Sequence, residues 1–568
     1  MRQWILREKI PNDVSGELGD LPEMVKSLLF HRGIKTSQEA KKFLAPSYDD
    51  DTGDPLEILN MEKASLRIIK AIKDNEKIVV FGDYDADGVC ASVIFHDFFK
   101  RIGFENFHVH IPDRYLDGYG LTNKAVDEFK EIGASLIITL DCGVTNSEEV
   151  DRANSRGIDV VIIDHHIVPE EPPKAYAIVD LKQDGEKYPT KFLCGAGIAF
   201  KTVCALIKLG NFNIIPGWEK WLLDVVAVAT VADMVPMTQE NRVFVHYGLK
   251  VLRKTRRPGL LAFYRRLNLG PGTIGEDDLG FMIAPRLNVA GRMEHATVSF
   301  NLLTTQSPQE ADWISGRLEV MNNDRKGLVE KIINKIEEEV TDLPDINRII
   351  TAGDESWSPG VLGLAANRIL EKYNCPVFLW GKGGGNLKGS CRSDGSIDLV
   401  RFMRLMPEGI FEDLGGHSFS AGFTLAGNDT DRLKEEIGKL YAKLPKTAVE
   451  KVIKVEREML MDEVDQTFYS LIESFQPFGA ENPKPVFSFR GVKIFNVKKF
   501  GNGGIHLQFD FKKKDGSVIS AVGFFMSRED FFDYTSGQII DLAASLEKSY
   551  FKSKPELRLR IVDARKAA

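Results

Sequence analysis

Three short apolar runs in the first third of the chain are each followed by acidic or imidazole side chains. The runs are KIVVF at 77–81, LIITL at 136–140 and VVII at 160–163, and they alternate with amphipathic stretches of helical length. Runs this apolar are typical of strands buried on both faces, so the alternation predicts a parallel, doubly wound sheet. In such sheets ligands bind in the crevice beyond the carboxyl ends of the strands, which is where these polar residues are expected to lie.

The polar residues after the three runs predict a metal site. They are Asp83, Asp85 and Asp87 after the first run, Asp141 after the second, and Asp164, His165 and His166 after the third. Carboxylates crowded together repel one another, and a divalent cation is the simplest compensation. Oxygen-rich ligation with one or two imidazoles suits Mn²⁺ or Mg²⁺ better than zinc. Two such ions can activate water and stabilise a leaving oxygen in phosphoryl hydrolysis.

The remainder of the chain predicts a long helix and two further folded units. A helix is expected to start with Ser307 as N-cap, Pro308 in the first position and Glu310 completing a capping box, and to run to Val340. After the turn at 342–345 a second α/β unit begins with RIITAG at 348–353, and the last hundred or so residues alternate as in a small β-barrel of the OB type. The expected domains are a helical lead-in at 1–55 without assigned chemistry, a catalytic domain at 56–305, a connecting helix at 306–342, a second α/β domain at 343–450 and the barrel at 451–568.

Charge is distributed unevenly along the chain. The net charge is −8, yet residues 484–568 hold 16 Lys and Arg against 9 Asp and Glu. A basic barrel is suited to single-stranded nucleic acid, because cations follow the phosphates while aromatic rings stack on bases. The candidate side chains on this surface are Lys498, Lys499, Lys512, Lys513, Lys514, Lys552, Lys554, Arg558 and Arg560, with Phe500 and Tyr550 among them.

Cysteine spacing and hydropathy bear on the compartment. The six cysteines form no C-x-x-C pair, which argues against zinc knuckles and disulfide frameworks and favours a reducing environment. No stretch approaches the ~18–20 uncharged apolar residues that a membrane span needs. We therefore expect a cytoplasmic protein without membrane association.

The acidic motifs resemble those of a known superfamily. GDYDADG at 82–88, LDCG at 140–143 and DHH at 164–166 are similar to the first three motifs of the DHH phosphoesterases, and Asp233 in TVADMVP matches the fourth acid. The resemblance implies that two ions, Mn²⁺ or Mg²⁺, are held by Asp83, Asp85, Asp87, Asp141, His165 and Asp233. It further implies that Asp141 bridges the ions and that His166 faces the scissile phosphate.

Three later motifs are similar to the RecJ branch of this superfamily. They are APRLNVAGRM at 284–293, WSPGVLG at 357–363 and PFGAENP at 477–483. GSCRS at 389–393 and GGH at 415–417 look like the DHHA1 domain, which in the family helps to hold the substrate chain. Ser358 stands where the branch usually has histidine, and Glu481 where it has glycine. The resemblance implies an α/β fold of two lobes, a DHH lobe with a parallel doubly wound sheet and a DHHA1 lobe, joined by a long helix and followed by an OB-type barrel.

The resemblance also implies roles for individual residues. Catalysis would involve Asp141, His165, His166, Arg286, Arg292 and His417. Substrate binding would involve Arg114, Tyr119, Asn288, Arg368, Arg392, Ser393, Gly416, Lys498 and Lys499. Two arginines flanking an amide in the 284–293 motif supply the forked donors that phosphate recognition requires.

The implied activity is degradation of single-stranded DNA from the 5′ end by hydrolysis of terminal phosphodiesters. Partners expected from the resemblance are single-stranded-DNA-binding protein and a RecQ-type helicase, in recombination and mismatch repair. One alternative is an oligoribonuclease or cyclic-dinucleotide phosphodiesterase, which the barrel and the motif order argue against. Another is a binding protein that has lost catalysis, although every expected acid is present.

Overall fold

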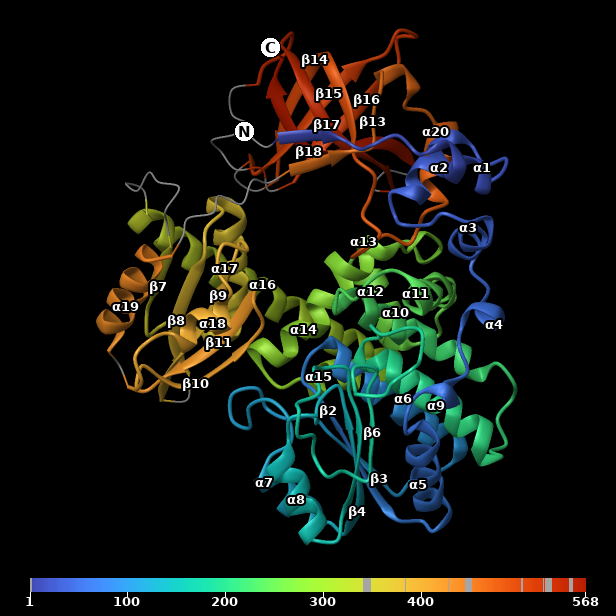
Figure 1. Cartoon of the computed structure of the whole chain (residues 1–568), viewed down its shortest axis with the longest axis vertical. Coiled ribbons are helices and arrows are strands. Elements are labelled where there is room, and N and C mark those ends of the chain that lie inside the picture. Colours follow the sequence, from blue (N-terminus) through green and yellow to red (C-terminus); the bar gives the residue numbers. More distant parts are fainter. Residues whose placement is uncertain are drawn as a thin grey trace.

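The computed structural model has two α/β lobes joined by a long helix, with a β-barrel above them (Figure 1). This arrangement confirms the predicted fold class. The structure describes residues 3–340, 349–383, 385–427, 429–444, 452–501, 504–524, 526, 534–550 and 555–567. The turn expected at 342–345 and the lysines Lys552 and Lys554 lie outside the described residues.

The first lobe is built on a five-stranded sheet in the order β3-β2-β4-β5-β6, and every neighbouring pair is parallel. Its strands are β2 (Lys77–Gly82), β3 (Phe107–His110), β4 (Ala134–Leu140), β5 (Asp159–Ile163) and β6 (Ala177–Val179). The three predicted strands are confirmed, and the short strands β3 and β6 extend the sheet on either side.

Helices cover both faces of this sheet, which makes it doubly wound. Alternate residues such as Ile78 and Ile138 pack with the helices of one face, while Val79 and Ile137 pack with those of the other. The first face is covered by α5 (Met61–Lys73), α6 (Ala86–Ile102) and α9 (Gly195–Gly210), and the second by α7 (Asn123–Glu131) and α8 (Ser147–Ser155). Burial on both faces explains why the strands are so uniformly apolar.

A helical layer completes this lobe and leads into the connecting helix. It contains α10 (Leu223–Ala232), α11 (Gln239–Leu252), α12 (Pro258–Arg266), α13 (Glu276–Asp278), α14 (Ala284–Met293) and α15 (Thr297–Thr304). The helix α16 (Pro308–Val340) follows. Leu318 of α16 belongs to the core of the first lobe and Ile332 to that of the second, so one helix supports both lobes.

The start of α16 agrees with the predicted N-cap but not with a full capping box. The backbone N–H of Glu310 donates to Ser307 Oγ at 3.3 Å, as expected of an N-cap. The backbone N–H of Ser307, however, donates to Thr305 Oγ1 at 3.1 Å. The Glu310 carboxylate accepts from the Thr305 hydroxyl instead, so Thr305 takes the place that the capping box gives to Glu310.

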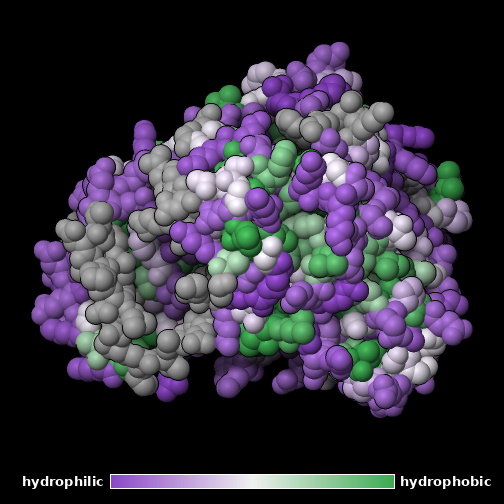
Figure 2. All heavy atoms as spheres, turned by 90° about the horizontal axis from the view of Figure 1, so that it is seen from above, coloured by the Kyte–Doolittle hydropathy of each residue, from purple (hydrophilic) through white to green (hydrophobic). Residues whose placement is uncertain are grey.

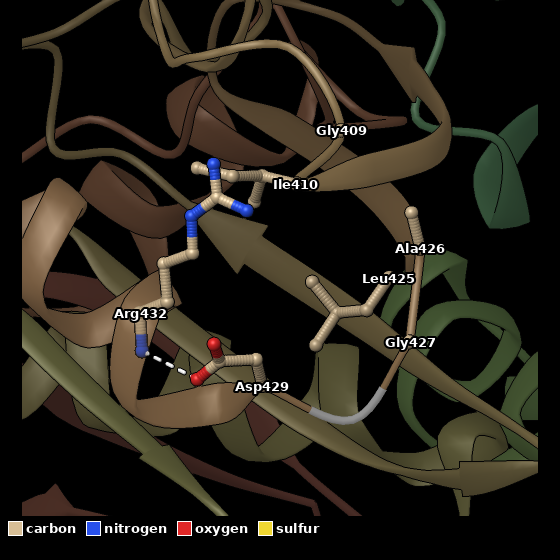
Figure 3. Close-up of a pocket in the computed structure, with 7 residues that line it drawn as sticks. All are labelled: Gly409, Ile410, Leu425, Ala426, Gly427, Asp429 and Arg432. Carbon is tan, nitrogen blue, oxygen red and sulfur yellow. Dashed lines mark hydrogen bonds between the residues drawn. The ribbon is translucent and has the colours of Figure 1, made fainter.

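The second lobe has a five-stranded mixed sheet in the order β10-β11-β9-β8-β7. Its strands are β7 (Ile350–Gly353), β8 (Val377–Gly383), β9 (Asn386–Arg392), β10 (Phe411–Gly416) and β11 (Ser420–Leu425), and its helices are α17 (Pro359–Tyr373), α18 (Leu399–Arg404) and α19 (Thr430–Ala442). A small hollow between β10, β11 and α19 is shown in Figure 3, where Asp429 accepts a hydrogen bond from the backbone N–H of Arg432 at 3.0 Å. Among the described residues that line this hollow, Asp429 is the only carboxylate and serves as the N-cap of α19, and none is a histidine.

The C-terminal strands close into a barrel. They are β13 (Arg457–Glu458), β14 (Phe487–Phe500), β15 (His506–Lys512), β16 (Val518–Gly523), β17 (Ile539–Ser549) and β18 (Glu556–Lys566), and α20 (Gln466–Glu473) precedes β14. The ring closes because β14 pairs with both β15 and β17. The long strand β14 is bent at a register shift between Phe489 and Val492. Viewed from above, the surface is mainly hydrophilic, with apolar side chains in separate patches (Figure 2).

The N-terminal segment packs on the barrel, which the sequence did not indicate. Its strand β1 (Gln3–Leu6) pairs in parallel with β12 (Val452–Val455). The helices are α1 (Asn12–Glu17), α2 (Glu23–Phe30), α3 (Ser37–Leu44) and α4 (Tyr48–Asp51). Leu28, Leu29 and Phe43 belong to the same core cluster as Phe475 and Phe487. Residues 3–44 are therefore a layer of the barrel domain rather than a free lead-in.

Candidate metal centre

Backbone hydrogen bonds continue one residue beyond the strands and hold the predicted ligands side by side. The N–H of Asp83 donates to Leu140 O at 3.2 Å, and the N–H of Asp141 donates to Ile163 O at 2.9 Å. Asp141 has φ 62°, in the left-handed region that aspartate tolerates better than most residues. The acids thus leave their strands along one edge of the sheet, as the sequence predicted.

The six expected ligands converge. His165 Nε2 lies 3.1 Å from Asp141 Oδ1 and 3.9 Å from Asp87 Oδ2, while His165 Nδ1 lies 3.8 Å from Asp233 Oδ2. Within each of three groups the ligand atoms lie within 4.8 Å of one another. These groups are Asp141, His165 and His166; Asp87, His165 and Asp233; and Asp83, Asp85 and Asp141. We call these seven residues the acid cluster.

Burial and mutual repulsion raise the pKa values of four carboxylates of the acid cluster. Burial, together with neighbouring carboxylates, raises the pKa of Asp83 and of Asp141 well above the usual range. The same causes raise the pKa of Asp87 to about 6 and that of Asp233 to about 8. Asp83 Oδ1 and Asp141 Oδ1 are buried and accept no hydrogen bond from the part of the chain that the structure describes. Buried, unpartnered carboxylate oxygens are costly without a cation, so the donor set fits Mn²⁺ or Mg²⁺.

The two histidines differ in their environments. Burial, with the neighbouring His166, lowers the pKa of His165 to about 3, which leaves its imidazole neutral and able to bind a metal. Burial opposes protonation of His166 as well, but its hydrogen bond to Asp164 raises its pKa. Asp164 Oδ1 lies 2.7 Å from His166 Nδ1 and also accepts the backbone N–H groups of both histidines. Asp164 therefore orients the pair.

The start of α9 supports the acid cluster, and sequence reasoning missed it. The N–H groups of Gly195 and Ala196 donate to the Asp87 carboxylate at 2.6 and 2.8 Å. A Cβ at Gly195 would lie only 2.6 Å from Asp141 Cβ, so only glycine fits here. The run of small residues in Gly195-Ala196-Gly197 at a helix start is the signal that could have indicated a close approach.

Helix α14 supports the acidic loop from the other side. Asn288 Oδ1, expected to bind substrate, accepts the backbone N–H of Ala86 at 2.7 Å. A Cβ at Gly291 would lie 2.6 Å from the carbonyl oxygen of Tyr84. In this structure Asn288 thus holds the loop that carries Asp85 and Asp87.

The arginines expected near phosphate are already engaged. Arg286 is buried and its guanidinium forms a two-point ion pair with Glu319 of α16, with Nε–Oε2 2.5 Å and Nη2–Oε1 3.1 Å. Arg292 Nη1 donates to the carbonyl oxygen of Gly360 at 3.1 Å and so joins the two lobes. The placement of Arg286 differs from an open phosphate contact, because Glu319 competes for the same donors.

The Tyr84 ring organises a second group of expected contacts. Arg114 lies over this ring, with its guanidinium carbon 4.6 Å from the ring centroid. The Tyr119 ring meets the Tyr84 ring edge-on, and the Tyr119 hydroxyl lies 3.2 Å from His166 Nδ1. Tyr119 therefore connects Arg114 and Tyr84 to the acid cluster.

The second lobe contributes residues that lie outside the acid cluster. Arg392 Nη1 donates to Ser390 Oγ at 3.0 Å, and Ser393 Oγ donates to Ile397 O at 2.6 Å. Gly416 is the last residue of β10, and the exposed His417 begins the turn to β11. Arg368 is paired with Glu330 at 2.9 Å. Ser358 is the N-cap residue of α17 and makes no side-chain capping bond.

Two further expectations concern the barrel and the loop before it. Lys498 and Lys499 are exposed on β14. Arg560 lies over the ring of Phe524, 3.9 Å from its centroid. Glu481 has φ 59°, the left-handed conformation that explains why glycine is usual at this position.

Comparisons with known proteins agree with this geometry. The family model of the DHH family, N-terminal domain, matches residues 77–230, that of the DHHA1 domain 345–443, and that of the RecJ OB domain 455–563. The single-stranded-DNA-specific exonuclease RecJ of Bacillus subtilis is 35% identical over 88% of this chain, which spans 63% of that relative's length. The single-stranded-DNA-specific exonuclease RecJ of Thermus thermophilus is 31% identical over 85% of this chain, and the match covers 68% of the length of that protein.

Solved structures agree as well. A crystal structure of RecJ from Thermus thermophilus in complex with Mn²⁺ has a TM-score of 0.82 and 25% sequence identity to this chain. The match covers 100% of this chain and 80% of the chain in the crystal. A second structure of that protein is a complex with Mg²⁺. Among the described residues no helix combines the length and apolar character needed to cross a bilayer. All three domain models match in this chain, and the similarity to RecJ proteins extends over most of its length. The chain therefore belongs to the RecJ family.

Proposed function

We propose that this chain is an exonuclease specific for single-stranded DNA that hydrolyses terminal phosphodiesters from the 5′ end. The observation that carries the proposal is the acid cluster, in which buried carboxylate oxygens without partners meet a neutral imidazole. The substrate follows from the relatives, which are named single-stranded-DNA-specific exonucleases and match most of the chain. The direction of digestion rests on the motif resemblance.

Asp83, Asp85, Asp87, Asp141, His165 and Asp233 would hold two cations, Mn²⁺ or Mg²⁺. When bound, the cations supply Lewis-acid stabilisation of phosphate charge and lower the pKa of water. The motif resemblance implies that Asp141 would bridge them, and its position supports this, because Asp141, like His165, belongs to two of the three groups of ligand atoms. His166, whose pKa is raised by its hydrogen bond to Asp164, would lie beside a phosphate oxygen and stabilise its charge.

The second lobe and the barrel would hold the strand. Arg292 already spans the two lobes, and Arg392, Gly416 and His417 lie on the second lobe. The exposed lysines Lys498 and Lys499 on β14 suit phosphate contacts along a single strand. The RecJ OB domain favours a long strand over a dinucleotide as the substrate. The proposal includes roles in recombination and mismatch repair. It also includes partnership with single-stranded-DNA-binding protein or a RecQ-type helicase.

The test uses purified protein with Mn²⁺ or Mg²⁺ and 5′- or 3′-labelled single strands, blunt duplexes and dinucleotides. We expect digestion of single strands from the 5′ end and little digestion of duplexes or dinucleotides. Asp141→Ala should abolish hydrolysis, because a bridging carboxylate holds both cations. Preferred cleavage of dinucleotides, or near-normal digestion by Asp141→Ala in excess Mn²⁺, would contradict the proposal.

A further inference from the structure

A loop before the barrel docks onto the segment that follows Asp233. We call residues 475–483, between α20 and β14, the docking loop. The N–H of Met237 donates to Ala480 O of the docking loop at 2.7 Å. The Met237 side chain is buried against Gly479, where an added Cβ would meet Met237 Cε at 3.0 Å and Cβ at 3.1 Å. The contact therefore leaves no free space between the loop and Met237.

The docking loop is held rigidly against the first lobe. Arg242 of α11 is buried and donates to three successive carbonyl oxygens of the loop, those of Phe475 at 2.9 Å, Gln476 at 2.8 Å and Pro477 at 3.1 Å. The amide of Asn482 closes the loop on itself by donating to Phe475 O and Pro477 O. A buried guanidinium satisfied by carbonyl groups fixes both partners, because loss of any bond would leave a buried charge poorly solvated.

The docked segment also carries a residue of the acid cluster. Asp233 is the C-cap of α10, and only three residues separate it from Met237. The first of these, Met234, has φ 57°, and the last, Pro236, has its carbonyl oxygen bonded by Asn241 Nδ2 at 3.0 Å. Asp233 is thus fixed by α10 on one side and by the contact of Met237 with the docking loop on the other.

Asp233 depends on this support more than the strand-end acids do. Asp83 and Asp141 leave buried strands whose hydrogen-bond ladders hold them. Asp233 ends a helix, and its side chain, at 27% exposure, is open to solvent, whereas those of Asp87 and Asp141 are 2% and 3% exposed. A displacement of the following turn would therefore move the Asp233 carboxylate relative to His165.

We propose that the docking loop positions Asp233 through Met237, so that the barrel side of the chain sets the cation affinity of the acid cluster. Met237 and Gly479 are positioning residues in this account, since neither touches the cluster. The inference rests on the proposed role of Asp233 as a metal ligand. Contacts outside the ligand shell commonly change metal affinity by about 10–100-fold, so the effect is measurable.

The test adds one methyl group at the contact. In Gly479→Ala the new Cβ pushes Met237, and we expect the Kd for Mn²⁺, measured by electron paramagnetic resonance, to rise by about tenfold. The same change in a Met237→Ala background should raise the Kd less, because the Cε and Cγ atoms that the methyl group would meet are gone. The matched control is Gly438→Ala in α19, where a Cβ meets nothing within 4 Å.

Three further outcomes decide between explanations. An unchanged Mn²⁺ affinity in Gly479→Ala, with or without a lower Tm in EDTA, would show that the loop is only structural and would overturn the inference. Equal weakening in Gly438→Ala would overturn it as well. Asp233→Ala tests the ligand assignment separately from the positioning by the docking loop. An unchanged Mn²⁺ affinity in that variant would refute the role of Asp233 as a metal ligand.

Discussion

Replacing Gly195 by alanine tests whether the position of Asp141 limits the reaction. Gly195 begins α9, and its added Cβ would lie 2.6 Å from Asp141 Cβ and 2.8 Å from Asp141 Cγ and Oδ1. Ordinary van der Waals contact begins near 3.4 Å, so Asp141 or the helix start must move by about 0.8 Å. The N–H of Gly195 also holds Asp87, so both carboxylates are displaced together.

The expected magnitude follows from this displacement. A misplacement near 1 Å in a catalytic constellation costs about 100-fold in rate, and we expect that loss for Gly195→Ala. Gly197→Ala is the matched control, because it lies in the same turn of α9 and its Cβ would meet no atom closer than Leu193 Cβ at 3.3 Å. Alanine in place of glycine should otherwise favour the helix in both variants.

The assay compares initial rates of nucleotide release from 5′-labelled single strands in saturating Mn²⁺ for wild type and both variants. Thermal unfolding in EDTA checks that each variant is folded. Gly197→Ala should remain close to wild type. Equal rates for Gly195→Ala and Gly197→Ala would refute the reasoning, since Asp141 would then tolerate the displacement that the close contact imposes.

Three other predictions address pH, salt and loop support. The pKa values of Asp87 (about 6) and Asp233 (about 8) lie above the ordinary range, so protonation stabilises the metal-free fold and this stabilisation is lost as pH rises through those values. Cation binding needs the deprotonated carboxylates. The difference in Tm between Mn²⁺-treated and EDTA-treated protein should therefore widen from about pH 6 to about pH 8. A difference that stays constant over this range would contradict this prediction. Joint replacement of Lys498 and Lys499 by alanine should reduce the slope of log K against log salt for single strands by about 1.4, and an unchanged slope would remove them from the phosphate contacts. Asn288→Ala leaves a loop N–H without its acceptor and should lower the free energy of unfolding in urea by about 1–3 kcal/mol, whereas an unaltered value would mean that water replaces the amide.

The parts of the site that the sequence predicted are those set by local pattern. The runs that became β2, β4 and β5 are mainly apolar, and an acid directly after a parallel strand lies at the carboxyl edge of the sheet. The long helix α16 was likewise recognisable from its N-cap and its helical spacing. In contrast, β17 begins with Ile539 and Ile540 but continues through small and charged residues, which obscured its pattern.

The parts that the sequence could not predict depend on partners distant in the chain. Arg286 has the side chain expected of a phosphate ligand, yet its ion pair with Glu319 arises only when α14 packs on α16. The four-residue pairing of β1 with β12 has no local signature, because its register is set by tertiary packing. Sequence pattern predicts which residues carry the chemistry, and packing decides which of them are open to a ligand.

The attachment of the N-terminal segment to the barrel has a consequence for synthesis. The apolar side chains of α2 and α3, such as Leu28 and Phe43, find their partners in a core whose other members begin at Met459, about 400 residues later. At about 5–20 residues per second, the ribosome needs roughly 20–80 s to reach the first of these later members. During this interval α2 and α3 lack these burial partners, so their final packing has to wait until the barrel residues have been synthesised.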